Sequence, residues 1–74
     1  MSKRQLTTAS AVIDRLGGNQ PVAVITGRMP GAVSNWRRFN AFPPNTYLAL
    51  TEALRAAGET APDSLWGMAR QASA

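Results

Sequence analysis

The stretch "TGRMPGAVSNWRRF", residues 26–39, decides how this chain can fold. Gly27 can take the left-handed backbone conformation of a tight turn without a steric penalty. Pro30 suits the first turn of a helix, where its missing N–H is not needed. Val33 and Trp36 stand three residues apart, which places two apolar side chains on the same face of that helix. The stretch therefore predicts a tight turn followed by a helix with an apolar inner face.

The chain on either side of this stretch also favours helices. Leu6, Ala9, Ile13 and Leu16 follow the 3.6-residue period of one helical face, and a threonine before them can cap its start. The expected helices cover residues 7–16, 20–26, 30–39, 44–57 and a short segment within 60–69. Four helices and a short fifth, joined by connections of a few residues, predict an all-α, single-domain bundle.

The segments 22–26 and 44–57 show how the helices are assigned and which side chains they should bury. The β-branched run 22–26 also suits a strand, but no other segment matches it as a partner strand, so a helix is favoured there. The stripe that should be buried in 44–57 consists of Tyr47, Leu50, Leu54 and Ala57. Tyr47 and Trp66 are expected either in the core or in contact between two copies of the chain.

Composition excludes several classes of function. The 74 residues include no Cys and no His, which removes disulfides, Cys/His zinc sites, thiol nucleophiles and imidazole acid–base chemistry. The few carboxylates are scattered, and no glycine-rich loop has the pattern of a phosphate-binding loop. No apolar run approaches the roughly 18 residues that a membrane span needs. We therefore expect no enzyme activity, cofactor, metal ion, small-molecule ligand or membrane insertion.

Charge is distributed unevenly along the chain. Residues 1–38 hold six Lys and Arg against one Asp, a net charge of +5, while residues 39–74 hold two against three, a net charge of −1. A basic half of this kind suggests a polyanionic partner, with nucleic acid favoured over an anionic membrane surface. The alternative is a basic surface that serves only solubility.

Residues 19–39 meet the demands of a helix-turn-helix unit. Ala23 is small at the point where the two helices must cross closely, and Gly27 opens the turn between them. Val33 and Trp36 would hold the second helix down; Trp36 is therefore expected in the core rather than stacked on a base. In a helix-turn-helix protein that second helix lies in the major groove of DNA.

The sequence here resembles a known family. "GAVSNWRR" followed by "FPPNTYLALTEAL" is similar to the Cro-like branch of phage-repressor helix-turn-helix proteins, including the YdaS-type, over roughly residues 8–68. The resemblance implies a small DNA-binding regulator, usually homodimeric, that acts on a short operator. It implies a phage-derived repressor that works by occupying a promoter, located in the cytoplasm at the bacterial nucleoid. We expect a flexible basic arm over 1–6, the DNA-binding domain over 7–69 and a frayed tail over 70–74.

Candidate DNA contacts follow from the motif. The residues expected to read bases on double-stranded DNA are Ser34, Asn35, Arg37 and Arg38. The residues expected at the DNA backbone are Gln20, Arg28, Pro30, Gly31, Lys3 and Arg4. Pro30 and Gly31 have no side-chain donor, so only a close backbone approach to a phosphate or a thymine methyl group is expected from them.

Other interpretations of the same residues stay open. Asn35, Arg37 and Arg38 also fit an ordinary solvated helix face, and Lys3 with Arg4 also fits a plain disordered terminus. The rival function is a helix-turn-helix module that acts mainly through protein contact, as an antitoxin or accessory factor. A homodimer is expected in the DNA-binding case, with its contact near 60–74 or the end of the helix 44–57.

Overall fold

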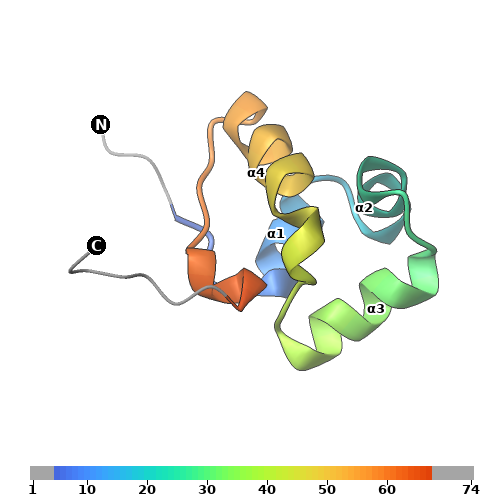
Figure 1. Cartoon of the computed structure of the whole chain (residues 1–74). Coiled ribbons are helices and arrows are strands. Elements are labelled where there is room, and N and C mark those ends of the chain that lie inside the picture. Colours follow the sequence, from blue (N-terminus) through green and yellow to red (C-terminus); the bar gives the residue numbers. More distant parts are fainter. Residues whose placement is uncertain (1–4, 68–74) are drawn as a thin grey trace.

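The computed structural model describes residues 5–67 of the chain. About 67% of it is helical, in a compact small domain. The elements are α1 (Ala9–Arg15), α2 (Asn19–Thr26), α3 (Pro30–Phe39), the 3-10 turn η1 (Pro44–Thr46), α4 (Tyr47–Ala56) and the 3-10 turn η2 (Asp63–Trp66) (Figure 1). Within residues 5–67 no strand forms, so the strand alternative for 22–26 is wrong and the all-α prediction is confirmed.

Local chemistry explains where the first helices begin and end. Thr8 is the N-cap of α1, and its hydroxyl oxygen accepts a hydrogen bond from the Ala11 N–H at 3.1 Å. α2 ends at Gly27, which has the left-handed conformation (φ 71°) that the sequence predicts. α3 starts at Pro30, also as predicted, and ends at Asn40, the one non-glycine residue with a positive φ (54°) among residues 5–67.

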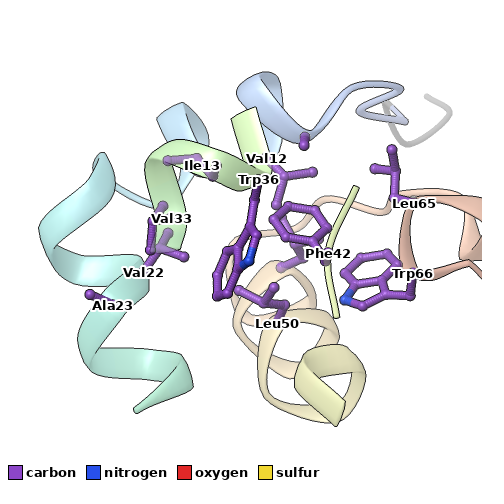
Figure 2. Packing of buried hydrophobic residues seen from close by; sticks show 12 residues of the cluster. Val12, Ile13, Val22, Ala23, Val33, Trp36, Phe42, Leu50, Leu65 and Trp66 are labelled. Atoms are coloured by element: carbon purple, nitrogen blue, oxygen red, sulfur yellow. The ribbon is translucent and has the colours of Figure 1, made fainter. Parts of the chain in front are cut away.

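One hydrophobic core joins the four α-helices and η2. Its fully or nearly buried members are Ala9, Val12, Ile13, Val22, Ala23, Val33, Trp36, Phe42, Leu50, Leu54, Leu65 and Trp66 (Figure 2). The aromatic rings form a connected series within it: Trp36 meets Phe42 edge-on with ring centres 5.7 Å apart, and Phe42 stacks on Trp66 at 5.0 Å. Tyr47 contacts the other side of Trp66 edge-on at 5.2 Å. Trp66 and Tyr47 thus pack inside the domain, and Trp66 is fully buried.

The second half of the chain differs in detail from the sequence prediction. The helix expected over 44–57 is divided into η1 and α4, with Leu50 and Leu54 buried and Tyr47 and Ala57 half-buried. The short helix expected within 60–69 is a single 3-10 turn, Asp63–Trp66, that Pro62 precedes.

The two ends of the described chain lie side by side. Gln5 pairs with Thr60 in an isolated parallel bridge, and the Leu6 N–H donates to the Thr60 carbonyl at 2.8 Å. Leu6 also packs against the core, so the last two residues of the expected basic arm 1–6 are attached to the domain. Lys3, Arg4 and the expected tail 70–74 lie outside the described residues.

Thr46 supplies a polar contact inside this core. Its side chain is buried, accepts a hydrogen bond from the Trp66 indole Nε1 at 3.2 Å and donates one to the Pro43 carbonyl at 2.7 Å. Thr46→Val keeps the shape but leaves both partners without these bonds. We expect the substitution to lower the free energy of unfolding by about 1–3 kcal/mol, measured by urea denaturation.

Thr51→Val is the matched control. The Thr51 hydroxyl bonds back to the Tyr47 carbonyl at 2.7 Å on a half-buried face of α4, where water can replace it. If Thr46→Val is no more destabilising than Thr51→Val, the buried contact between Thr46 and Trp66 does not stabilise the fold.

Candidate nucleic-acid interface

α3 lies along one edge of the domain and packs against both α1 and α2 (Figure 1). Residues 27–29 connect α2 to α3. Ala23 lies at the α2–α3 contact with Val22 and Val33, and it is 5% exposed (Figure 2). Val33 and Trp36, the predicted inner face of α3, are buried in the core. The small Ala23 side chain allows this close contact because a larger group would separate the helices.

The opposite side of α3 faces solvent. Its central members are Gly31, Ser34, Asn35 and Arg38, spaced at i, i+3, i+4 and i+7, and all four are exposed. We call these four residues the α3 face. The side chains of Asn35 and Arg38 make no hydrogen bond or ion pair with another residue in the 5–67 part of the chain. Their donors and acceptors are therefore available to a partner.

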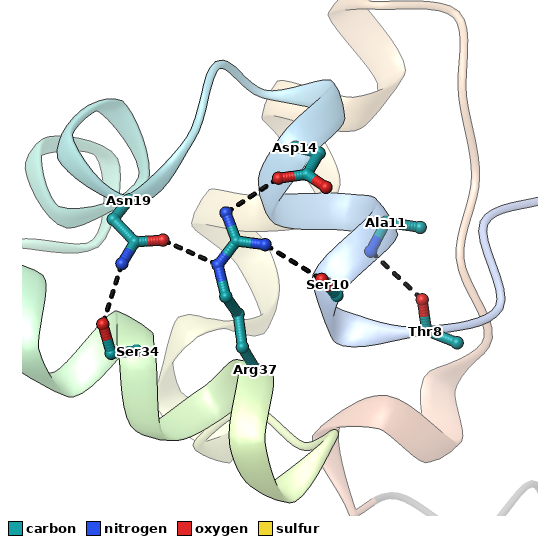
Figure 3. Close-up of polar contacts among 7 residues, drawn as sticks. All are labelled: Thr8, Ser10, Ala11, Asp14, Asn19, Ser34 and Arg37. Atoms are coloured by element: carbon teal, nitrogen blue, oxygen red, sulfur yellow. Dashed lines mark hydrogen bonds and ion pairs between the residues drawn. The ribbon is translucent and has the colours of Figure 1, made fainter.

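Arg37 does not belong to this face. Its guanidinium donates from Nε to Asn19 Oδ1 at 2.8 Å, from Nη1 to Ser10 Oγ at 2.9 Å and from Nη2 to Asp14 Oδ1 at 2.8 Å (Figure 3). These bonds connect α3 to α1 and to the start of α2. The geometry does not favour the expected base-reading role of Arg37, because its donors already satisfy groups within the protein.

Ser34 is held by the same residue that holds Arg37. The amide Nδ2 of Asn19 donates to Ser34 Oγ at 2.9 Å, while Asn19 Oδ1 accepts from Arg37 (Figure 3). Ser34 stays exposed, so its hydroxyl proton can still reach a partner. Asn19 thus aligns α2 with the middle of α3.

Two further contacts hold the ends of α3. Asn40, just after α3, accepts a hydrogen bond on Oδ1 from the Ala9 N–H at 2.7 Å, which satisfies a free donor at the start of α1. Before α3, Arg28 donates from Nη2 to Asn45 Oδ1 at 2.9 Å. Sequence reasoning missed both Asn40 and Asn45. The one signal for them in the sequence is an asparagine at a helix boundary, where its short polar side chain can hydrogen-bond to nearby groups.

The remaining expected backbone contacts differ in exposure. Gln20 and Arg28 are exposed, and Pro30 is half-buried at the first position of α3. Lys3 and Arg4 lie outside the described residues.

Electrostatics favour an anion beside α3. No Asp or Glu occurs in the sequence between Asp14 and Glu52, and the Asp14 carboxylate is paired with Arg37. Glu59 is buried and paired with Arg15 at 2.8 Å, at the chain just after α4, where Arg15 also donates to the Ala57 carbonyl. Arg28 and Arg38 are thus exposed cations on a part of the chain that is free of carboxylates.

Apolar side chains are also exposed here, which the sequence analysis did not foresee. Val24 on α2 is 81% exposed, Met29 before α3 is 74% exposed and Phe39 at its end is 72% exposed. A helical pattern with a short apolar stripe does not show which of the remaining apolar residues stay outside. Leu48 on α4 is a further example at 71% exposure.

Neighbouring arginines on α3 should differ in their effect on stability. Replacing Arg37 with Met removes three hydrogen bonds from a half-buried guanidinium, so we expect a loss of about 1–2 kcal/mol in the free energy of unfolding. Arg38→Met, one residue along and exposed, is the control and should change stability by less than about 0.5 kcal/mol. Urea denaturation measures both. Equal effects would show that the contacts of Arg37 do not hold α3 in place.

No comparison identifies a relative of this chain: a scan against protein-family models, a search of curated proteins and a search of solved structures all gave no match. Within residues 5–67, no helix is long and apolar enough to cross a membrane. In the same part of the chain, no group of three or more acidic, His or Cys side chains lies together as metal ligands would. A functional proposal therefore rests on the geometry around α3.

Proposed function

We propose that the protein is a sequence-specific regulator of transcription that binds double-stranded DNA. In this proposal α2 and α3 act as a helix-turn-helix and the α3 face enters the major groove. The observation that carries it is the exposed row of Ser34, Asn35 and Arg38, opposite the buried Val33 and Trp36 on a short, firmly packed helix.

The chemistry of the α3 face suits base edges. An asparagine amide can both donate to and accept from adenine, so Asn35 is the residue we assign to an A·T pair. Arg38 can pair with guanine or with a phosphate, and Ser34 can donate its hydroxyl proton to several acceptors. Asn35 and Arg38 make no contacts with α1 or α2 among residues 5–67 of the kind that Arg37 makes.

The surroundings of α3 suit the DNA backbone. Phosphate contacts set the orientation of a protein on DNA, and they need cations and amide donors at the edges of the reading helix. Arg28 provides such a group before α3, Asn45 on η1 provides one beside Arg28, and Gln20 provides one on α2. Asn45 keeps its amide Nδ2 available, since only its Oδ1 bonds to Arg28.

The size of the domain supports action as a homodimer. One recognition helix buries too little surface for tight binding, whereas two copies reading half-sites about one helical turn apart bury twice as much. Simple occupation of a promoter is the regulatory mechanism we propose. This is the behaviour of a phage-type repressor.

Docking to another protein is the second candidate, and a specific observation favours it. Val24, Met29 and Phe39 are all more than 70% exposed on α2, the turn and α3. Exposed apolar groups of this size commonly mark protein interfaces. Arg28 and Arg38 on the same part of the chain weigh against it, because charged residues are depleted at the centre of such interfaces.

Selection of bound sequences from random duplex DNA tests the proposal. We expect enrichment of a palindromic site with half-sites about one helical turn apart. Binding should weaken roughly a hundredfold between 50 mM and 200 mM salt, if Arg28 and Arg38 of each protomer release counterions from four phosphates. Absence of any enriched sequence would favour protein docking instead, and a flat salt response would contradict the electrostatic contribution.

Asn35→Ala should relax base preference at one position of each half-site. The substitution removes a bidentate contact and should weaken binding by about 1–3 kcal/mol, with the loss confined to the duplex that carries the preferred base. Ser64→Ala, an exposed change on η2, is the control and should leave both the affinity and the base preference unchanged. Affinity for duplexes that vary one base pair at a time gives the measurement. A uniform loss across all duplexes would mean that Asn35 contacts the DNA backbone.

A further inference from the structure

Gly31 stands in the first turn of α3 without a structural reason for being glycine. Its φ lies outside the positive region, and a Cβ added to it would meet no other atom within 4 Å. Gly27, by contrast, has a φ of 71°, which explains glycine there. Glycine in a helix is less stable than alanine because it loses more backbone entropy on folding. The fold therefore gains nothing from glycine at position 31.

The α3 face is apolar at its start and polar further along. Met29 lies two residues before Gly31 and is 74% exposed. Pro30, between them, has no N–H and no side-chain hydrogen-bonding group. Ser34 and Asn35 follow one helical turn further along α3.

A base edge that fits this surface must be apolar. In the major groove the four bases present hydrogen-bond donors and acceptors, and thymine alone adds an apolar group, its C5-methyl. Gly31 stands in one row with Ser34 and Asn35, which are proposed to face base edges, and neither Met29 nor Pro30 offers a side-chain donor to a phosphate. The space left open by the missing Cβ of Gly31 is a suitable seat for one methyl group.

We propose that Gly31 is a specificity-determining residue whose bare Cα, preceded by the exposed Met29, receives the 5-methyl group of a thymine in each half-site. The inference rests on the proposed DNA-binding function and adds the kind of base read by the first turn of α3. Asn35, one helical turn further along, then reads a neighbouring base pair through hydrogen bonds.

Replacing thymine by deoxyuridine removes the methyl group and nothing else. We expect one thymine per half-site of the selected duplex at which this change weakens binding of the natural protein about fourfold, the worth of one buried methyl group. Gly31→Ala should reverse the preference for thymine over deoxyuridine at that position and at no other. The added Cβ occupies the seat, so the thymine duplex binds more weakly and the deoxyuridine duplex binds at least as well.

Two further variants make the result specific. Leu48→Ala removes an equally exposed apolar side chain from α4 and should leave the thymine preference unchanged, whereas Met29→Ala should reduce it. The melting temperature of Gly31→Ala should equal or exceed that of the natural protein, since nothing in the fold opposes a Cβ there. If Gly31→Ala fails to fold, the deoxyuridine series with Met29→Ala still decides the question.

Each outcome has one meaning. Equal binding of thymine and deoxyuridine duplexes at every position overturns the role of Gly31 and leaves DNA binding standing. An unchanged thymine preference in Gly31→Ala or in Met29→Ala also overturns it. Failure of the natural protein to bind any selected duplex overturns the proposed function itself, and the thymine contact with it.

Discussion

The arrangement of the domain depends on the packing of Trp36. This side chain, 8% exposed, joins α3 to the rest of the molecule through its edge-on contact with Phe42, which in turn stacks on Trp66. A short chain buries a limited area, so a few large aromatic rings supply much of its hydrophobic stabilisation. Because Trp36 holds the inner side of α3, the outer side is presented to solvent in one orientation. The Phe42 N–H also donates to the Leu65 carbonyl at 2.6 Å, which attaches the chain after α3 to η2.

Polar contacts add to the aromatic core in fixing the position of α3. Arg37, Asn19 and Asn40 connect α3 to α1 and α2, and Asn40 also satisfies a backbone N–H that α1 leaves without a partner at its start. The contrast between Arg37 and Arg38 follows from helix geometry. A step of one residue rotates the side chain by about 100°, from the border of α1 to the open face. One arginine therefore stabilises the fold, while its neighbour is free to bind a partner.

The candidate site was predictable in its location but only partly in its members. A basic segment with an apolar inner face indicated α3, and the exposed positions of Ser34, Asn35 and Arg38 agree with that interpretation. The placement of Arg37 was not predictable, because its partners Ser10 and Asp14 are 27 and 23 residues away in the sequence. The same holds for the pairing of Arg28 with Asn45, 17 residues apart, which depends on how the turn before α3 meets η1.

The sequence by itself determined the helices near residues 26–39, since a left-handed glycine, a proline at a first turn and a 3.6-residue period act through the local backbone. Only the tertiary structure decided which polar residues work inside the fold and which remain available. Hydrogen bonds between distant segments depend on the distance and angle that packing creates, and residue type alone does not contain either. The structure also decided that Gly31 has open space beside it. A glycine in a sequence can mean a strained turn, a close contact or an empty surface, and the surroundings distinguish the three.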